Sequence, residues 1–210
     1  MEVESVRVAE SIRMRSPVSD ILFDRFLPSA ARSVSAMYWT PLAAAVVAAR
    51  WFDEVGARTV LDIGSGAGKF CVAAALASKA SFVGVEHRAN LVDVARQLAR
   101  QFRIADRASF LHEPFAADIA VGADAYYLYN PFGENLFERA EQLDASVELG
   151  DPRYLRDVAF AEDLLKRAAV GTHLVTYSGF GGLVPRTYAQ VRVEWSLPSV
   201  LKMWKKTSDA

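Results

Sequence analysis

The sequence predicts an α/β protein in which a doubly wound, seven-stranded and mostly parallel sheet ends in an antiparallel C-terminal hairpin, with a helical N-terminal cap. Two observations lead to this fold class. From Thr59 onward, short apolar runs typical of strands alternate with segments of helical pattern, and right-handed crossovers between such elements produce a parallel sheet. Residues 188–206 lack a long helical pattern, so two strands there are expected to pair as a hairpin at the sheet edge.

The N-terminal segment, residues 1–55, is expected to form helices that cap a single sheet-containing unit of residues 56–210. Its clearest helical pieces are residues 19–27 and the segment that starts at Thr40. Thr40 followed by Pro41 predicts a capping side chain and a first-turn proline for the second piece. The chain has no internal repeat and no low-complexity linker, so no second domain is expected.

Five strands and three helices are expected in the alternating part of the chain. In the second of these helices, Leu91, Val94 and Leu98 recur at helical spacing and form an apolar face. Strand alternation should place Tyr127 and Tyr126 on opposite faces of the sheet. The expected strands are residues 59–64, 81–86, 108–113, 125–131 and 172–179, and the expected helices are residues 67–80, 89–102 and 153–169.

Composition and charge exclude several classes of protein. The 210 residues are 52% hydrophobic with a net charge of −1, so the chain fits one globular domain and has no overall basic field for nucleic acid or an anionic membrane. Its single cysteine, Cys71, excludes an internal disulfide and is expected as a buried thiol in a reducing compartment. The N-terminus lacks the apolar core of a signal peptide, and the apolar run 41–51 has about half the length of a membrane span. We therefore expect a soluble cytoplasmic protein.

The glycine-rich stretch 59–70 fits neither of two phosphate-binding patterns. The P-loop pattern requires glycine where Ile63 stands and a hydroxyl residue where Phe70 stands. The dinucleotide pattern requires a third glycine where Lys69 stands. The Gly-Lys pair therefore does not indicate a phosphate ligand, and Lys69 is interpreted as a first-turn residue of the following helix.

What remains is an aspartate followed by three alternating glycines, Asp62, Gly64, Gly66 and Gly68, between a strand and a helix. The next expected strand ends in Glu86, about 22 residues beyond Gly64. A carboxylate at that place can accept hydrogen bonds from both ribose hydroxyls of a nucleoside, as the acid of the dinucleotide fold does. The pattern therefore favours a nucleoside-containing cofactor.

With these features the sequence resembles the class I S-adenosylmethionine-dependent methyltransferases, over about residues 55–180. The resemblance implies a Rossmann-like fold, S-adenosyl-L-methionine as cofactor and methyl transfer as the activity. The segments that resemble family motifs are residues 60–70, 82–88, 110–115 and 126–135.

The resemblance also implies roles for individual residues. The backbone of Gly64 to Gly66 would pass below the methionine and ribose portion of the cofactor, with Asp62 facing its amino group. Glu86 would bind the ribose hydroxyls and His87 would lie beside the adenine. Glu113 would stand near the adenine amino group, although an exposed glutamate before a proline-marked turn explains it equally well. The expected cofactor-binding residues are Asp62, Gly64, Ser65, Gly66, Gly68, Glu86, His87, Glu113, Phe115, Asn130 and Trp39.

The end of the fourth expected strand carries Asn130, Pro131 and Phe132. They resemble a shortened form of the Asn-Pro-Pro-aromatic motif of amino-group methyltransferases, in which the asparagine oxygen and a proline carbonyl accept hydrogen bonds from the target amine and the ring packs on it. The second proline is missing here, and a strand-terminal turn is the alternative interpretation. With Tyr129, the tyrosine nearest the ligand edge, these three are the candidate catalytic residues.

Three further residues have two interpretations each. Trp39, before the helix that starts near Thr40, covers the cofactor or anchors the core. Tyr177 lines the pocket or packs in the sheet. His112 is a base or a structural histidine. None of the three histidines forms a pair with helical ligand spacing, so no metal is expected.

The predicted function is methyl transfer from S-adenosylmethionine to a nitrogen or oxygen of a small molecule or protein side chain. One alternative is an RNA methyltransferase, against which the lack of a basic stripe argues, although Lys-rich residues 202–206 and the Arg-rich segment 96–103 leave room for it. Another is a non-catalytic protein that binds the cofactor for regulation. The acceptor and the oligomeric state stay open.

Overall fold

The computed structural model describes residues 2–116, 118–119 and 122–209. The described residues form the strands β1 (Thr59–Ile63), β2 (Ser81–Glu86), β3 (Ala108–His112), β4 (Ala125–Tyr129), β5 (His173–Tyr177), β6 (Tyr188–Glu194) and β7 (Leu201–Lys206). These strands make one sheet in the order β3-β2-β1-β4-β5-β7-β6. β1 to β5 pair in parallel, whereas β7 is antiparallel to both β5 and β6. The predicted parallel sheet with a C-terminal hairpin is confirmed.

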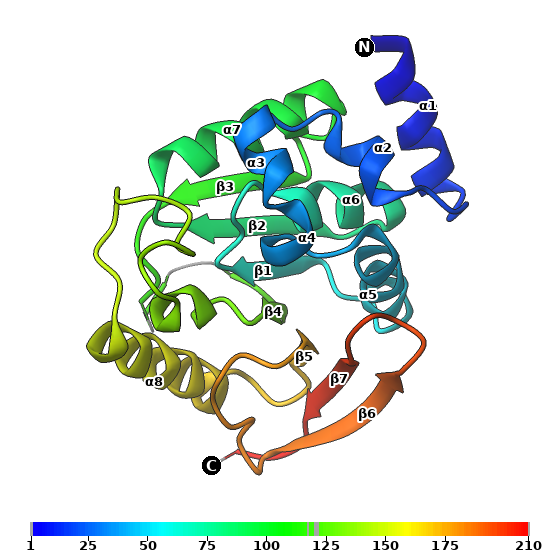
Figure 1. Ribbon diagram of the computed structural model, residues 1–210. Helices are drawn as coiled ribbons and strands as arrows, with labels where there is room; N and C mark the ends of the chain where they lie inside the picture. Colours follow the sequence, from blue (N-terminus) through cyan, green and yellow to red (C-terminus); the bar gives the residue numbers. More distant parts are fainter. Residues whose placement is uncertain (1, 117, 120–121, 210) are drawn as a thin grey trace.

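Helices cover both faces of the sheet (Figure 1). They are α1 (Glu2–Arg13), α2 (Asp20–Asp24), α3 (Ser29–Ser33), α4 (Ser35–Tyr38), α5 (Leu42–Glu54), α6 (Lys69–Ala77), α7 (Ala89–Gln101), the 3-10 helix η1 (Gly133–Leu136) and α8 (Asp151–Arg167). Apolar side chains of α5, α6 and α7 share a core cluster with Phe82 and Tyr127, and those of α8 share the other cluster with Leu61 and Tyr126. Tyr126 and Tyr127 therefore lie on opposite faces, as predicted. No helix in the described part of the chain is long and apolar enough to span a bilayer.

The helices before the sheet are joined to its core. Val8 and Ile12 of α1 and Phe23 of α2 are buried in the same cluster as α5, α6 and α7. The ring of Phe23 stacks on that of Phe102, at the end of α7, with 5.0 Å between centroids. The division of the chain at residues 55 and 56 stays a prediction.

The predicted cap of α5 is wrong. Pro41 stands at the N-cap and Leu42 begins the helix. The backbone N–H of Leu42 donates to Asp20 Oδ1 at 2.9 Å, so a carboxylate of α2 replaces the expected capping hydroxyl. Thr40 instead has its hydroxyl 3.0 Å from that of Tyr127. The sequence pattern failed here because the acceptor comes from a distant segment.

The parallel register brings three chain segments to one edge of the sheet. Ile63 at the end of β1 lies opposite Val85 of β2 and Leu128 of β4. Beyond β1, the N–H groups of Gly64 and Ser65 donate to Val85 O at 2.9 and 3.0 Å. The glycine loop and the ends of β2 and β4 therefore meet at the carboxyl edge, where open α/β sheets bind ligands.

Candidate functional site

An open cleft of about 900 Å³, including its solvent-filled mouth, lies at this carboxyl edge. Its walls come from the glycine loop, the ends of β2 and β4, the segment before α5, η1 and the first turns of α8. A smaller cavity adjoins it on the side of Asp62 and Lys69. Trp39, Gly64 and Tyr129 line both spaces.

The glycine loop is tightly packed on two sides. Gly64 and Gly66 have φ angles of +73° and +52°, which residues with a Cβ rarely adopt. A Cβ on Gly64 would lie 2.8 Å from Pro131 Cβ, and one on Gly66 would lie 2.3 Å from Trp39 Cζ3. The loop backbone therefore runs between Pro131 and Trp39. Gly68 lines neither cavity and starts α6 against Ala95 and Phe110.

Glu86 is a buried carboxylate at the end of β2 that lines the cleft, with 6% of the residue exposed. Its Oε2 accepts a hydrogen bond from the backbone N–H of Gly66 at 3.0 Å, and its Oε1 accepts one from that of Arg88 at 2.9 Å. Burial raises its pKa. The two residues that the sequence predicted to act together, Gly66 and Glu86, are thus in direct contact.

Asp62 lies under the glycine loop and lines the smaller cavity. Its Oδ2 accepts a hydrogen bond from the buried thiol of Cys71 at 3.3 Å. Burial, with a contribution from the charge of Glu86, raises the pKa of Asp62 to about 7. Ser65 lines the same cavity, and its buried Oγ has no hydrogen-bond partner among the described residues. A polar ligand group could satisfy both side chains.

His87 lies between two guanidinium groups. Arg153 of α8 contacts Nδ1, and Arg88 Nη1 is 3.0 Å from Nε2. Burial and these two positive charges lower the pKa of His87 to about 3, so its imidazole is neutral at physiological pH. A neutral ring beside the cleft suits contact with a flat, uncharged ligand surface.

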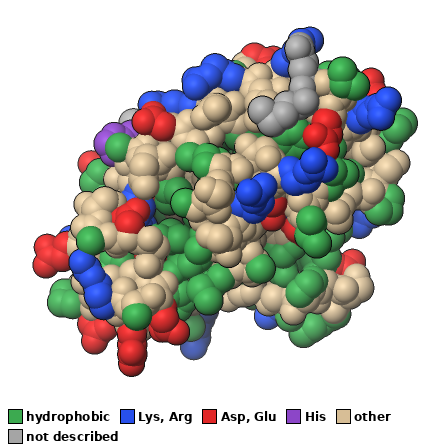
Figure 2. Space-filling view, turned by 45° about the horizontal axis from the view of Figure 1, so that its top comes forward, with side chains coloured by type: hydrophobic (Ala, Val, Ile, Leu, Met, Phe, Trp, Pro, Cys, Tyr) green, Lys and Arg blue, Asp and Glu red, His purple; other side chains and the backbone are tan. Residues whose placement is uncertain are grey.

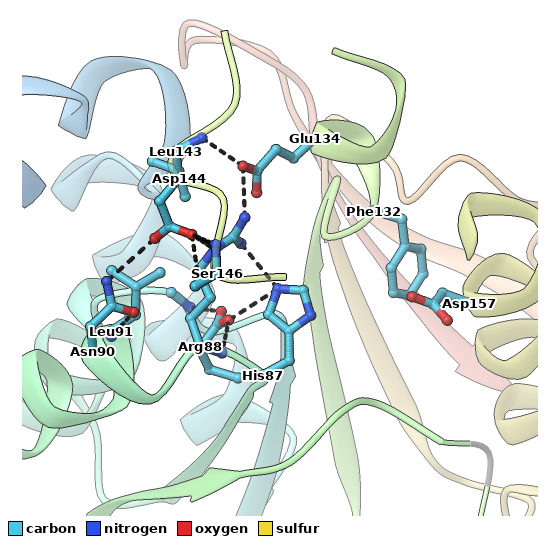
Figure 3. Close-up of polar contacts among 12 residues, drawn as sticks. His87, Arg88, Asn90, Leu91, Phe132, Glu134, Leu143, Asp144, Ser146 and Asp157 are labelled. Atoms are coloured by element: carbon cyan, nitrogen blue, oxygen red, sulfur yellow. Dashed lines mark hydrogen bonds and ion pairs between the residues drawn. The ribbon is translucent and has the colours of Figure 1, made fainter. Parts of the chain in front are cut away.

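Arg88 fastens the segment after β4 to the end of β2 (Figure 3). Its guanidinium is buried and pairs with Glu134 Oε1 at 2.9 Å and with Asp144 Oδ1 at 3.2 Å. Glu134 Oε1 also accepts the N–H of Leu143 at 2.7 Å, and Leu143 lines the cleft. Sequence reasoning missed this network because its members lie far apart in the chain.

The α8 wall contributes a second pair that the sequence analysis missed. Asp157 is buried and, like Phe132, lines the cleft (Figure 3). Its Oδ2 pairs with Arg153 at 3.3 Å and its Oδ1 pairs with Arg156 at 2.9 Å. The i,i+4 spacing of Arg153 and Asp157 was the available signal, but exposed helix pairs have the same spacing.

Asn130, Pro131 and Phe132 differ in exposure. Asn130 has a φ of +37°, its side chain is exposed at the cleft, and its side-chain amide has no hydrogen-bond partner among the described residues. Pro131 packs on Gly64. Phe132 is buried and stacks on Phe115 with 5.9 Å between centroids. Asn130 is therefore available to a ligand, whereas Phe132 mainly builds the cleft wall.

The remaining predicted residues separate into two groups. Trp39, Tyr129, Glu113 and Phe115 line the cleft. Tyr177 lines neither cavity and packs on Tyr129 with 4.9 Å between ring centroids. His112 is exposed at the end of β3 and also lines neither space. The described residues contain no group of three or more His, Cys, Asp or Glu side chains placed to hold a metal ion.

Comparisons with known proteins agree with this arrangement. Residues 55–121 match a family model described as a methyltransferase domain. An RNA methyltransferase from Salinibacter ruber, solved with S-adenosyl-L-homocysteine, is 23% identical, with a TM-score of 0.56 over 79% of this chain and 92% of that one. An O-methyltransferase from Bacillus cereus, also solved with S-adenosyl-L-homocysteine, is 12% identical, with a TM-score of 0.58 over 98% of this chain and 100% of that one. No curated protein matches the chain.

Proposed function

We propose that this chain, which shares the fold of solved methyltransferases and matches a methyltransferase domain over residues 55–121, transfers a methyl group from S-adenosylmethionine to a nitrogen or oxygen of a small molecule or protein side chain. One observation carries the proposal. The buried carboxylate of Glu86 binds the N–H of Gly66 at 3.0 Å inside the cleft. This contact joins the glycine loop to the acid that the family uses for a nucleoside.

The residues present fit the chemistry of this cofactor. Glu86 would accept hydrogen bonds from the ribose hydroxyls, and the neutral ring of His87 would lie against the adenine. Asp62 would ionise beside the cofactor's ammonium group, and the unpartnered hydroxyl of Ser65 would bind its polar end. The cofactor supplies an electrophilic methyl group on a sulfonium. The protein's task is to align an acceptor atom with it and to exclude water.

Asn130 is the side chain we assign to the acceptor. Its amide has no described partner, lines the cleft and stands next to Pro131, which packs on the glycine loop. The amide oxygen can accept a hydrogen bond from an amine or hydroxyl acceptor. Tyr129, at the junction of the two cavities, would orient the acceptor from the other side. These roles favour acceptors small enough to enter the cleft.

Calorimetry with S-adenosylhomocysteine tests the cofactor assignment. We expect the wild-type chain to bind it and E86A to lose about 1–3 kcal/mol of binding free energy, the scale of hydrogen bonds to a charged group. E138A is the matched control because Glu138 is exposed and lines neither cavity. If wild type binds neither the methyl donor nor its product, the assignment is wrong.

A second candidate function is methylation of RNA, because the Salinibacter ruber protein of similar fold is an RNA methyltransferase. Acidic and basic side chains are interspersed on the face shown in Figure 2, with no continuous basic stripe among the residues described there, and this argues for a smaller acceptor. Salt-dependent binding of RNA would reverse the order of the two candidates. We also propose a cytoplasmic location for this protein. The free thiol of Cys71 supports it, because disulfides are rare in a reducing compartment.

A further inference from the structure

Lys69 has surroundings that a helix-starting residue does not need. Its side chain is 2% exposed. Its Nζ lies 2.6 Å from Asp20 Oδ1 and 2.7 Å from Asp24 Oδ1, and it donates to Ser35 Oγ at 3.1 Å. A buried ammonium is tolerated only when it is paired and hydrogen-bonded. Lys69 therefore binds the segment before α5 to the helix that follows the glycine loop.

The partners of Lys69 position the ends of their own elements. Asp20 also accepts the N–H of Leu42 and so starts α5. Ser35 starts α4, and its carbonyl accepts the N–H of Trp39 at 3.0 Å. A single side chain thus holds α2, α4 and the first turn of α5 against α6.

Trp39 is the residue of this segment that reaches the site. Its indole lies on Gly66, where it would clash with any Cβ, and its Nε1 donates to Ala31 O at 2.8 Å. It lines both the cleft that contains Glu86 and the smaller cavity that contains Asp62. A ligand that extends from Glu86 to Asp62 must therefore lie beside this indole.

We propose that Lys69 is a positioning residue for the methyl-donor site: it fastens residues 20–40 to α6 and so holds Trp39 as the wall over the amino-acid end of the donor. The inference rests on the proposed function, because it concerns the same ligand. Lys69 acts through Trp39 and does not itself need to touch the ligand. Loss of the ammonium frees the segment, so the site is no longer preorganised for ligands that extend beneath Trp39.

Two ligands separate this role from general structural support. S-adenosylhomocysteine contains the amino-acid end, and methylthioadenosine lacks it. For K69M we expect S-adenosylhomocysteine to bind about tenfold more weakly, with methylthioadenosine unchanged within about twofold. K79M is the control, since Lys79 is exposed and should leave both affinities unchanged. Equal weakening of both ligands would overturn the proposal.

A double-mutant cycle tests whether Lys69 acts through Trp39. W39A should show the same ligand-selective loss, and W39A/K69M should be no weaker than W39A because both changes remove one interaction. Additive losses would contradict the proposal. If K69M does not fold, D24N replaces it, because asparagine has the shape of aspartate and keeps one acceptor oxygen. We expect the same selective loss of affinity for S-adenosylhomocysteine, but a smaller one. If the wild-type protein binds neither ligand, the proposed function is wrong. If the wild-type protein binds both ligands but the variants weaken both equally, only the role proposed for Lys69 is wrong.

Discussion

Asp62 is a buried carboxyl group with no cationic partner among the described residues. Burial raises its pKa from 3.8 to about 7. Because the pKa in the folded state lies above that in the unfolded chain, the folded protein holds the proton more tightly between about pH 4 and pH 7. The contribution of Asp62 to the free energy of unfolding therefore falls as the pH rises through this window. Above about pH 7, the ionised carboxylate lowers the free energy of unfolding by an amount that no longer changes with pH.

We predict that D62N is more stable than wild type at pH 8 and that this advantage disappears by about pH 4, where wild type is protonated. Urea unfolding of both proteins across this range measures the difference. D106N serves as the control, because Asp106 is exposed and its replacement should add no pH dependence. Equal stability of D62N and wild type at pH 8 would show that Asp62 ionises without cost.

At the residue scale, the sequence predicted roles that depend on short spacing and missed those that depend on distant partners. Gly66 and Glu86 were predicted to share a ligand, and they are in contact. Lys69 was correctly placed at the start of its helix, but its partner Ser35 is 34 positions away. No local pattern encodes such a pair, and only the packing of α2 and α4 on α6 creates it.

At the element scale, the segment between β4 and α8 is held by one buried guanidinium. Arg88 pairs with Glu134 and Asp144, and Glu134 also binds the N–H of Leu143. The side chains of Arg88 and Glu134 are 3% and 12% exposed, whereas that of Asp144 is 31% exposed. Water therefore weakens the pair with Asp144 more than the pair with Glu134.

We predict that E134A destabilises the protein by about 1–3 kcal/mol, because it leaves a buried donor group of Arg88 without its acceptor. The amide of Leu143 should also lose its protection against hydrogen exchange. D144N, which changes the more exposed partner, should have the smaller effect on both. Urea unfolding and exchange of residues 137–149 measure these outcomes. Unchanged protection in E134A would mean that the segment is held by its apolar contacts alone.

The elements themselves were largely predictable, and their capping was not. Alternation of apolar runs located each strand of the parallel sheet and the hairpin within two residues at each end. The cap of α5 was wrong because Asp20, not Thr40, accepts the first N–H. The segment after β4 was predicted only as far as the turn at Asn130, since its fastening depends on Arg88, 46 positions before Glu134. Periodicity reports burial within an element, and these contacts lie between elements.

At the scale of the whole molecule, the N-terminal helices belong to the core of the sheet. Ile12 and Phe23 are buried in the cluster that contains Phe82 and Tyr127. Lys69 is paired only with residues before α5 among its described contacts. This packing argues that residues 1–55, which the sequence predicted as a helical cap, fold together with the sheet.

We predict that the fragment of residues 41–210 is less stable than the full chain by about 3 kcal/mol or more, because the core cluster loses the buried apolar side chains of Ile12 and Phe23. Urea unfolding, followed by circular dichroism, compares the two.

The full chain should unfold in one transition and gain about 2.7 kcal/mol from S-adenosylhomocysteine at a hundredfold excess over its dissociation constant. The fragment lacks Trp39 and should gain less. A fragment that matches the full chain in both stability and ligand-dependent gain would mean that the N-terminal helices only cover a finished domain, and it would remove the basis for placing Lys69 and Trp39 in the site.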